Sequence, residues 1–214
     1  MVLLDVSRSD SPKVYGYGFV VYDCSSLLTV SRHILGSIHA ISRIMCTEFV
    51  GSLASWSTFV KTVLWGFSWK TAGFHESAAR RSLISALEKS MHIVIASRRG
   101  LDHALDFLTS VINNRYTFIV CDSGREEVKC SDELAKRVPE RHRVEKHVRY
   151  TPFLSLADYI AGIARYRSTT SYLNEWVQRI GEEPLRELVA KLRRYERAYR
   201  SLLNRLRTRV REFV

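Results

Sequence analysis

Apolar and aromatic residues gather in three short runs near the start of the chain. The runs cover residues 2–7, 14–23 and 26–35, and polar residues stand between them. Short runs of β-branched and aromatic residues that end in polar residues are typical of strands. We therefore predict three successive antiparallel strands joined as a meander.

Residues 37–64 carry a different pattern, in which apolar side chains recur at three- and four-residue spacing. This spacing predicts a long amphipathic helix with Ser37 as its N-cap. The residues that follow predict a short strand at 65–71 and a second helix at 75–90.

Strand and helix patterns alternate in the middle of the chain. Buried-type strands are predicted at 92–97 and 116–122, with a helix at 101–114 between them. This alternation implies a parallel pair of strands with a crossover helix. The charged residues 123–143 predict a loop that contains one short helix around 132–138.

Helical patterns dominate the last part of the chain. The run 144–150 is typical of a strand, and a helix follows it. Gly181 and Pro184 interrupt the helical pattern, because glycine often ends a helix and proline cannot continue one. Apolar residues then repeat with near-heptad spacing over 185–213, which predicts one long terminal helix.

The character of the sequence changes at about residue 168. Beyond it, the polar positions of the final helix carry ten basic residues against three acids. We therefore predict an α/β domain over residues 1–167 and a basic helical extension over residues 168–214. The apolar seam of the final helix predicts either packing on its own domain or a homodimeric coiled coil.

The chain has a formal net charge of +11 and a pI near 9.7. Such a surplus attracts polyanions, so nucleic acid, DNA or RNA, is the leading partner class. An arginine-rich surface used for ion pairs is the alternative. The residues predicted to contact a nucleic-acid backbone are basic and lie beside predicted strand ends or on the final helix: Lys70, Arg98, Arg99, Arg193, Arg194 and Arg197.

Nothing in the sequence predicts a membrane span or an export signal, because apolar runs stay far below about 18 residues. The four cysteines form no CxxC pair, which favours reduced thiols and a cytoplasmic protein. A single glutamine and many arginines are typical of a thermophile.

Four carboxylates stand where the local pattern is apolar: Asp5, Glu48, Asp122 and Asp158. Strand ends and a nearby helix can bring such residues to one cleft, and clustered carboxylates need cations to stay ionised. Mg²⁺ or Mn²⁺ takes oxygen ligands and leaves positions for water and phosphate. A water activated by the metal then attacks a phosphodiester. A basic chain with such a cluster therefore predicts a metal-dependent nuclease or a related phosphoryl-transfer enzyme.

Asp158 is the most informative of these acids. It stands among Ala157, Ala161 and Gly162, small residues that let a helix backbone approach a sheet closely. Burying a carboxylate without a partner costs folding free energy on the order of several kcal/mol. Asp158 therefore needs a cation, either Arg165 on the same helical face or a metal.

The order of predicted elements resembles the ribonuclease-H-like fold, a mixed sheet of three antiparallel strands and then parallel strands, flanked by helices. The stretches "LLDVS", "FSWKT", "FIVCDSG" and "SLADYIAGIARYR" are similar to an uncharacterised family within that superfamily. Its members open with an Ile-Asp-Glu-Ser-Gly strand and carry a Gln-Leu-Ala-Asp-x-x-Ala-Gly helix. The resemblance covers roughly residues 1–167, and it is an analogy of fold.

The resemblance implies that Asp5, Asp122 and Asp158 hold the metal, with Glu48 as a further catalytic acid. Val6 stands where the family often has a second acid, and Ser155 stands where it has Gln. Two alternatives to the nuclease remain, the first of them because of these departures. One is a non-catalytic nucleic-acid-binding protein on the same scaffold, and the other is a helical interaction protein that dimerises through residues 185–213.

Overall fold

The computed structural model describes residues 1–10, 13–31, 84–112, 117–139, 143–148 and 153–214. The helix predicted over 37–64, the strand at 65–71 and the first part of the helix at 75–90 lie outside these residues. Residues 84–87 are helical, as the last of these predictions requires.

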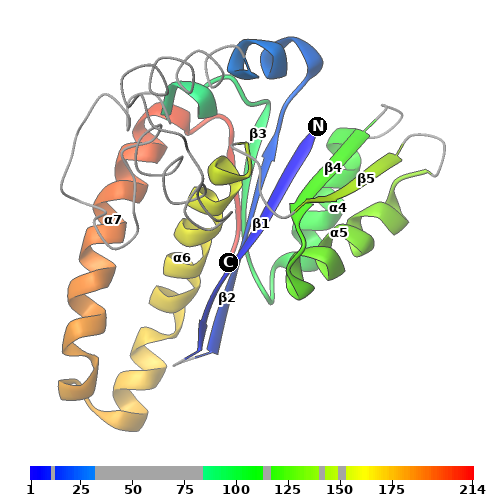
Figure 1. Cartoon of the computed structure of the whole chain (residues 1–214). Helices are drawn as coiled ribbons and strands as arrows, with labels where there is room; N and C mark the ends of the chain where they lie inside the picture. The colour runs from blue at the N-terminus through cyan, green and yellow to red at the C-terminus, as the bar shows by residue number, and fades with distance from the viewer. Residues whose placement is uncertain (11–12, 32–83, 113–116, 140–142, 149–152) are drawn as a thin grey trace, which may run out of the picture.

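Six strands of the described residues form one mixed sheet in the order β5-β4-β1-β2-β3-β6 (Figure 1). Strand β2 runs antiparallel to both of its neighbours, and the other neighbouring pairs are parallel. The predicted α/β class with a mixed sheet is therefore confirmed. The strands are β1 Val2–Asp10, β2 Lys13–Val21, β3 His92–Ser97, β4 Thr117–Asp122, β5 Arg143–Val148 and β6 Val210–Phe213.

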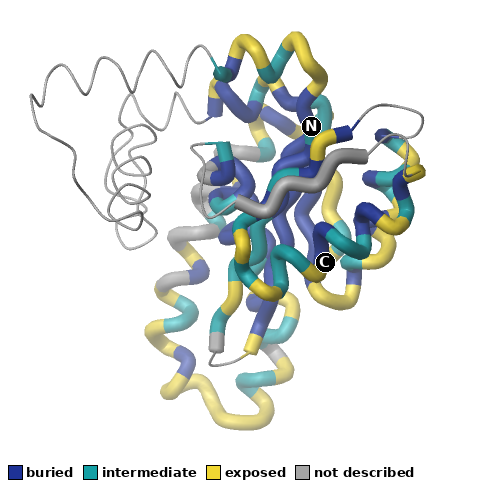
Figure 2. The backbone as a smooth tube through the Cα atoms, turned by 45° about the vertical axis from the view of Figure 1, so that its right-hand side comes forward, coloured by how far each residue is buried: buried dark blue, intermediate teal, exposed yellow. Residues whose placement is uncertain are grey.

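Helices cover both faces of the sheet, with α4 and α5 on one face and α6 and α7 on the other (Figure 1). None of the described helices is long and apolar enough to cross a membrane. The sheet between these layers is buried, while the turn that joins α6 to α7 is exposed (Figure 2). The helices are α4 Leu101–Ile112, α5 Arg125–Arg137, α6 Leu154–Ile180, the 3₁₀ helix η3 Glu183–Leu185, and α7 Arg186–Leu206.

Alternation along the strands divides the apolar side chains between two clusters. Leu3 and Val20 pack into the cluster on the α6 side, whereas Leu4 and Phe19 pack into the cluster on the α4 and α5 side. Successive strand residues point to opposite faces, which explains why neighbours in sequence belong to different clusters. The same alternation decides which face each polar residue of a strand occupies.

Helix α6 lies directly against β2, and two glycines make this contact possible. A Cβ placed on Gly18 would overlap the backbone nitrogen of Ala161 and lie 2.7 Å from the carbonyl oxygen of Ala157. A Cβ on Gly16 would overlap the backbone of Arg165. The close approach predicted from the small residues around Asp158 is therefore confirmed.

The strand predicted at 26–35 is wrong over its described part, because residues 24–31 are helical. Asp23 explains the difference. Its Oδ1 accepts hydrogen bonds from the backbone nitrogen of Ser26 at 2.7 Å and from Oγ of Ser25 at 3.0 Å. An aspartate that accepts the N–H three residues ahead is an N-cap, so a helix begins where the apolar run favours a strand.

The parallel pair predicted from the strands at 92–97 and 116–122 is not a pair of neighbours. These strands, β3 and β4, run in the same direction, but β1 and β2 lie between them. Backbone groups of β3 instead bond to β2 on one edge and to β6 on the other. The third antiparallel strand of the meander is thus β3, which comes much later in the chain than predicted.

Two helix lengths differ from the prediction. Helix α5 spans 13 residues, where a loop with one short helix was expected. Helix α7 ends at Leu206, and residues 210–213 of the predicted terminal helix form β6 beside β3. Val210 and Phe213 stand three residues apart, so their spacing fits a helix, but pairing with the edge of β3 satisfies their backbone groups as a strand.

The boundary predicted after residue 167 falls inside α6, which is one continuous helix. Gly181 ends it with φ +80°, a conformation that favours glycine. After the turn, α7 packs back on the same core through Leu192, Tyr199 and Leu206, which are buried. These three side chains therefore pack on their own domain, as one of the two predicted alternatives for the apolar seam requires.

Candidate functional site

Asp5 lies on β1 and faces α6. Leu3, two residues earlier on the strand, packs into the α6-side cluster, and the strand period of two puts Asp5 on the same face. Asp158 lies in the second turn of α6, and its carboxyl group forms a side-chain hydrogen bond with that of Asp5. The structure therefore brings together two of the acids that the sequence singled out.

The surroundings of Asp5 favour its protonated form. Burial raises the pKa of Asp5 well above its ordinary value, and the charge and hydrogen bond of Asp158 raise it further. The carboxylate of Glu127 acts in the same direction, while a hydrogen bond from the backbone of Val6 acts against it. The raised pKa of Asp5 favours the form in which its carboxyl can donate this hydrogen bond to Asp158.

Asp122 ends β4, the strand next to β1. The last paired residues of these two parallel strands are Leu4 and Cys121, so Asp122 follows one position later, level with Asp5. Val120 packs on the α6-side cluster, and alternation places Asp122 on that face as well. Its Oδ1 accepts the backbone N–H of Ser123 at 2.6 Å, an interaction typical of a strand-end turn.

The carboxylate of Glu127, in the first turn of α5, interacts electrostatically with acids on both strands, Asp5 on β1 and Asp122 on β4. Burial raises the pKa of Glu127, the charges of Asp122 and Glu126 raise it further, and Arg8 lowers it. Glu127 also raises the pKa of Asp5. The sequence analysis missed this residue because it stands in a charged stretch that has no apolar pattern to mark a buried acid.

Of the predicted metal ligands, the structure brings the carboxyls of Asp5 and Asp158 into contact. Within the described ranges, no group of three or more His, Cys, Asp or Glu side chains is arranged to hold a metal ion. The contacting carboxyls of Asp5 and Asp158 do fit a single hard cation, because Mg²⁺ is commonly held by one or two carboxylates and completes its shell with water or phosphate. Glu48 lies outside the described residues.

The other cation considered for Asp158 was Arg165, seven residues further along the same helical face. Its Nη1 donates a hydrogen bond to the backbone oxygen of Arg8 at 2.9 Å. This contact joins α6 to β1 at a point seven residues beyond Asp158 on the helix. Arg165 therefore has a structural partner of its own on β1.

The two departures from the family pattern occupy different places. Val6 packs on the cluster of the α4 and α5 side, so its position faces away from Asp158. Ser155 lies in the first turn of α6. An acid at position 6 would therefore not join Asp5 and Asp158 on their face of the sheet.

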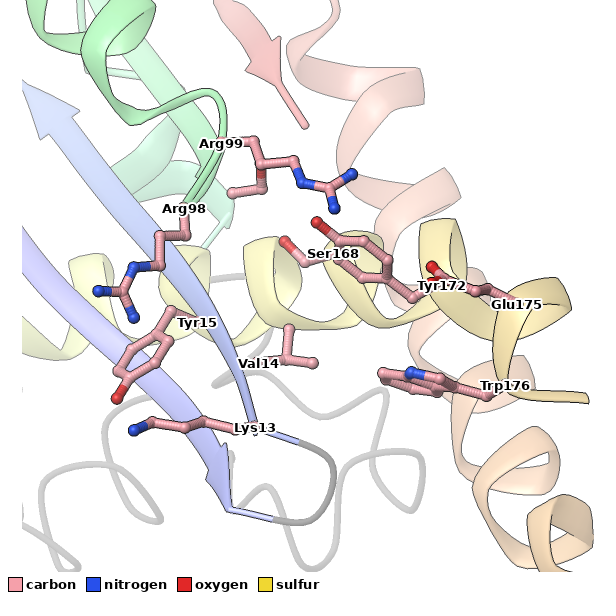
Figure 3. Close-up of a pocket in the computed structure, with 10 residues that line it drawn as sticks. Lys13, Val14, Tyr15, Arg98, Arg99, Ser168, Tyr172, Glu175 and Trp176 are labelled. Carbon is pink, nitrogen blue, oxygen red and sulfur yellow. The ribbon is translucent and has the colours of Figure 1, made fainter. Parts of the chain in front are cut away.

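The predicted backbone-binding residues separate into three groups. Arg98 and Arg99 follow β3 and line a pocket of about 590 Å³ (Figure 3). Arg193, which is exposed, lies on α7 together with Arg194 and Arg197. Lys70 lies outside the described residues. The pocket also contains Tyr15, Tyr172 and Trp176, none of which the sequence analysis singled out.

Comparisons with known proteins assign the chain to no family. No protein-family model and no curated protein sequence matches it. The acid pair of Asp5 and Asp158 and the basic pocket beyond it are therefore the observations on which a function rests.

Proposed function

We propose that this protein is a divalent-metal-dependent nuclease, in which Asp5 and Asp158 hold Mg²⁺ or Mn²⁺. The contact between the Asp5 and Asp158 carboxyls carries the proposal. Two carboxyl groups brought together in a partly buried site repel each other once both ionise, and the pair binds a proton or a cation to avoid this.

In this proposal the acid pair holds the metal, and two arginines of the pocket contact the substrate. Asp5 and Asp158 would hold the ion as carboxylates, with the Asp5 proton released to solvent water. The bound metal supplies Lewis-acid activation of water and neutralises charge on the phosphate. Arg98 and Arg99 bind the phosphate backbone without reading sequence, and Asp122 and Glu127 add negative potential beside the pair.

The sheet supports the ribonuclease-H-like assignment that we propose for the fold. Strands β1, β2 and β3 are antiparallel neighbours, β4 and β5 continue the sheet in parallel, and the acid-bearing helix α6 packs across β1 and β2. Strand β6, next to β3, is an addition to the arrangement that the resemblance implies.

Cleavage assays on the full chain test the proposal. We expect the wild-type protein to cut labelled DNA or RNA in the presence of Mg²⁺ or Mn²⁺ and to stop when EDTA is added. Asp158→Asn removes one ligand charge, and we expect it to lower the cleavage rate at least about 100-fold. Gel analysis of the labelled products measures both effects.

The matched control is Asp106→Asn, which changes an exposed aspartate of α4 on the opposite face of the sheet. We expect this variant to cleave at the wild-type rate. Absence of cleavage by the wild type with both metals and both nucleic acids contradicts the proposal. Cleavage by Asp158→Asn at the wild-type rate contradicts it as well.

A second candidate is a non-catalytic nucleic-acid-binding protein on the same scaffold. It is favoured by one observation, that the described acids assemble as a pair with no third ligand arranged for a metal. This candidate predicts salt-sensitive binding that EDTA leaves unchanged, together with no cleavage. The same preparation and the same labelled strands distinguish the two candidates.

A further inference from the structure

The pocket lies where the start of β2 projects beyond the end of β3. Gly16 pairs with Ser97, the last residue of β3, so the earlier residues of β2 have no β3 partner. The turn after β3 and the second half of α6 enclose this projecting end (Figure 3). The lining residues that the structure describes are Lys13, Val14, Tyr15, Ser97, Arg98, Arg99, Ser168, Tyr172, Glu175 and Trp176.

Cations and aromatic rings are paired on both sides of the pocket. The guanidinium carbon of Arg98 lies 5.2 Å from the ring centroid of Tyr15, and Nζ of Lys13 lies 6.0 Å from the same ring. On the α6 side, the guanidinium carbon of Arg99 lies 4.9 Å from the ring centroid of Tyr172. These separations are within the range of cation–π contacts, so the rings hold the cations at the pocket wall.

The two rings on α6 stack on one another at one wall of the pocket. Tyr172 and Trp176 stand one helical turn apart, with centroids separated by 6.1 Å and planes inclined by 27°. Both side chains are partly exposed. Aromatic rings that remain accessible beside basic residues are the features on which single-stranded nucleic acids stack their bases.

The charge of the pocket favours an anion. Three of its lining residues are cationic, Lys13, Arg98 and Arg99, and all three are exposed. The lining carboxylate, Glu175, is ion-paired with Arg179 at 2.7 Å, which offsets its charge. The volume of about 590 Å³ falls in the range of sites that enclose a small organic ligand, so it has room for a nucleotide.

One face of α6 connects the pocket to the acid pair. Asp158, Arg165, Tyr172 and Trp176 recur at helical spacing, seven, fourteen and eighteen residues from the first. At 1.5 Å per residue, Tyr172 lies roughly 21 Å along the axis from Asp158. A stacked strand that advances about 3.4 Å per nucleotide covers this length in roughly six nucleotides.

We infer that the pocket binds single-stranded nucleic acid, with a base stacked on Tyr172 and Trp176 and phosphates held by Lys13, Arg98 and Arg99. The inference deepens the proposed function, on which it rests, by naming a single strand as the substrate class. In a duplex the faces of the bases are covered by their neighbours, so the ring surface has nothing to stack on except an end. A single strand leads its backbone along α6 toward Asp158.

Binding in EDTA tests this inference apart from cleavage. Fluorescence anisotropy of the full chain measures affinity for labelled oligo(dT) and oligo(U) of about 20 nucleotides, and for a duplex of equal length. We expect single strands to bind at least about tenfold more tightly than the duplex. Tyr172→Leu should weaken single-strand binding about 5- to 150-fold, the effect typical of losing one stacked base.

Conservative and remote variants separate stacking from folding and from bulk charge. Tyr172→Phe keeps the ring, so we expect near wild-type affinity. Arg99→Ala should weaken binding more than Arg200→Ala, which removes an exposed charge on α7. Circular dichroism checks that every variant folds.

Three results overturn the inference: equal affinity for duplex and single strand, no effect of Tyr172→Leu in a folded variant, or competition by polyglutamate as strong as by oligo(dT). Failure of this binding test leaves the metal-dependent cleavage assay unaffected. Conversely, tight single-strand binding without cleavage contradicts only the nuclease proposal. The two conclusions therefore fail separately.

Discussion

At the scale of single residues, Asp5 links stability to pH and to metal. Its pKa is raised in the folded chain, so the stability that its proton supplies is complete below the ordinary aspartate pKa of about 3.9 and is lost as the pH rises through the folded value. Asp5→Asn keeps a hydrogen-bond donor for Asp158 and has no proton to lose as the pH rises. In the absence of metal, the free energy of unfolding of the wild type should decrease over this pH range, by about 1.4 kcal/mol for each pH unit by which the pKa of Asp5 is raised. We expect Asp5→Asn not to show this decrease.

Guanidinium unfolding between about pH 4 and pH 8, in EDTA, measures the difference. Asp106→Asn is the control and should keep the wild-type pH dependence, because Asp106 is exposed on α4. Adding Mg²⁺ should stabilise the wild type at the upper end of this range and leave Asp5→Asn unchanged, because a ligand that binds only the folded state stabilises it. Identical pH profiles of unfolding free energy for the wild type and Asp5→Asn contradict the raised pKa that we assign to Asp5.

The sequence predicted Asp5 and Asp158 because each interrupts an apolar pattern. Glu127 was beyond such reasoning, since its neighbours in the chain are also charged and only the packing of α5 against the sheet brings it to the strands. The pocket rings were missed for a related reason. Tyr15 and Trp176 lie more than 150 residues apart in the chain, and no local pattern relates them.

At the scale of elements, the contact between α6 and β2 sets the distance between the two acids. Gly18 pairs with Asp5 across β1 and β2, and Ala161 packs directly over it. We expect Gly18→Ala to destabilise the protein by about 1–3 kcal/mol, because the helix must move to admit the methyl group. The shift should also separate Asp158 from Asp5 and flatten the pH dependence of stability.

Gly124→Ala is the matched control for the predicted loss of stability. The new methyl group at position 124 would meet the carboxylate of Glu127, the end of a flexible side chain, rather than backbone. Gly124 also has φ −65° and ψ 148°, a conformation that alanine adopts readily. Guanidinium unfolding compares the two variants, and equal stability of Gly18→Ala and wild type contradicts the role assigned to this contact.

The elements show why local patterns were sufficient in some places and misleading in others. The small residues of α6 predicted its close approach because backbone contact requires them in any arrangement. The apolar run at 26–35 was ambiguous between strand and helix, and the Asp23 cap decides for the helix over its described part. The neighbours of β3 depend on contacts far apart in the chain, which periodicity does not encode.

At the scale of the whole molecule, both ends of the described chain belong to one sheet. Strand β1 is central, and β6 lies beside β3 at an edge. Arg167 on α6 forms an ion pair with Glu212 on β6 at 3.1 Å, and Gly100 lies against the backbone of Phe213. The final residues therefore complete the core that begins at β1.

This arrangement predicts that residues 1–167 do not fold cooperatively without residues 168–214. The shorter chain would lose the second half of α6, all of α7 and β6, and it would expose the edge of β3 and the apolar side chains that Leu192, Leu206 and Val210 cover. We expect the full chain to unfold in one transition by circular dichroism and by tryptophan fluorescence, and the 1–167 fragment to show no such transition. A protease site inserted in the exposed turn at 181–184 is the control, because cutting there leaves every element present. The nicked protein should keep the single transition, so a cooperative 1–167 fragment would mean that α7 and β6 are an appendage rather than part of the core.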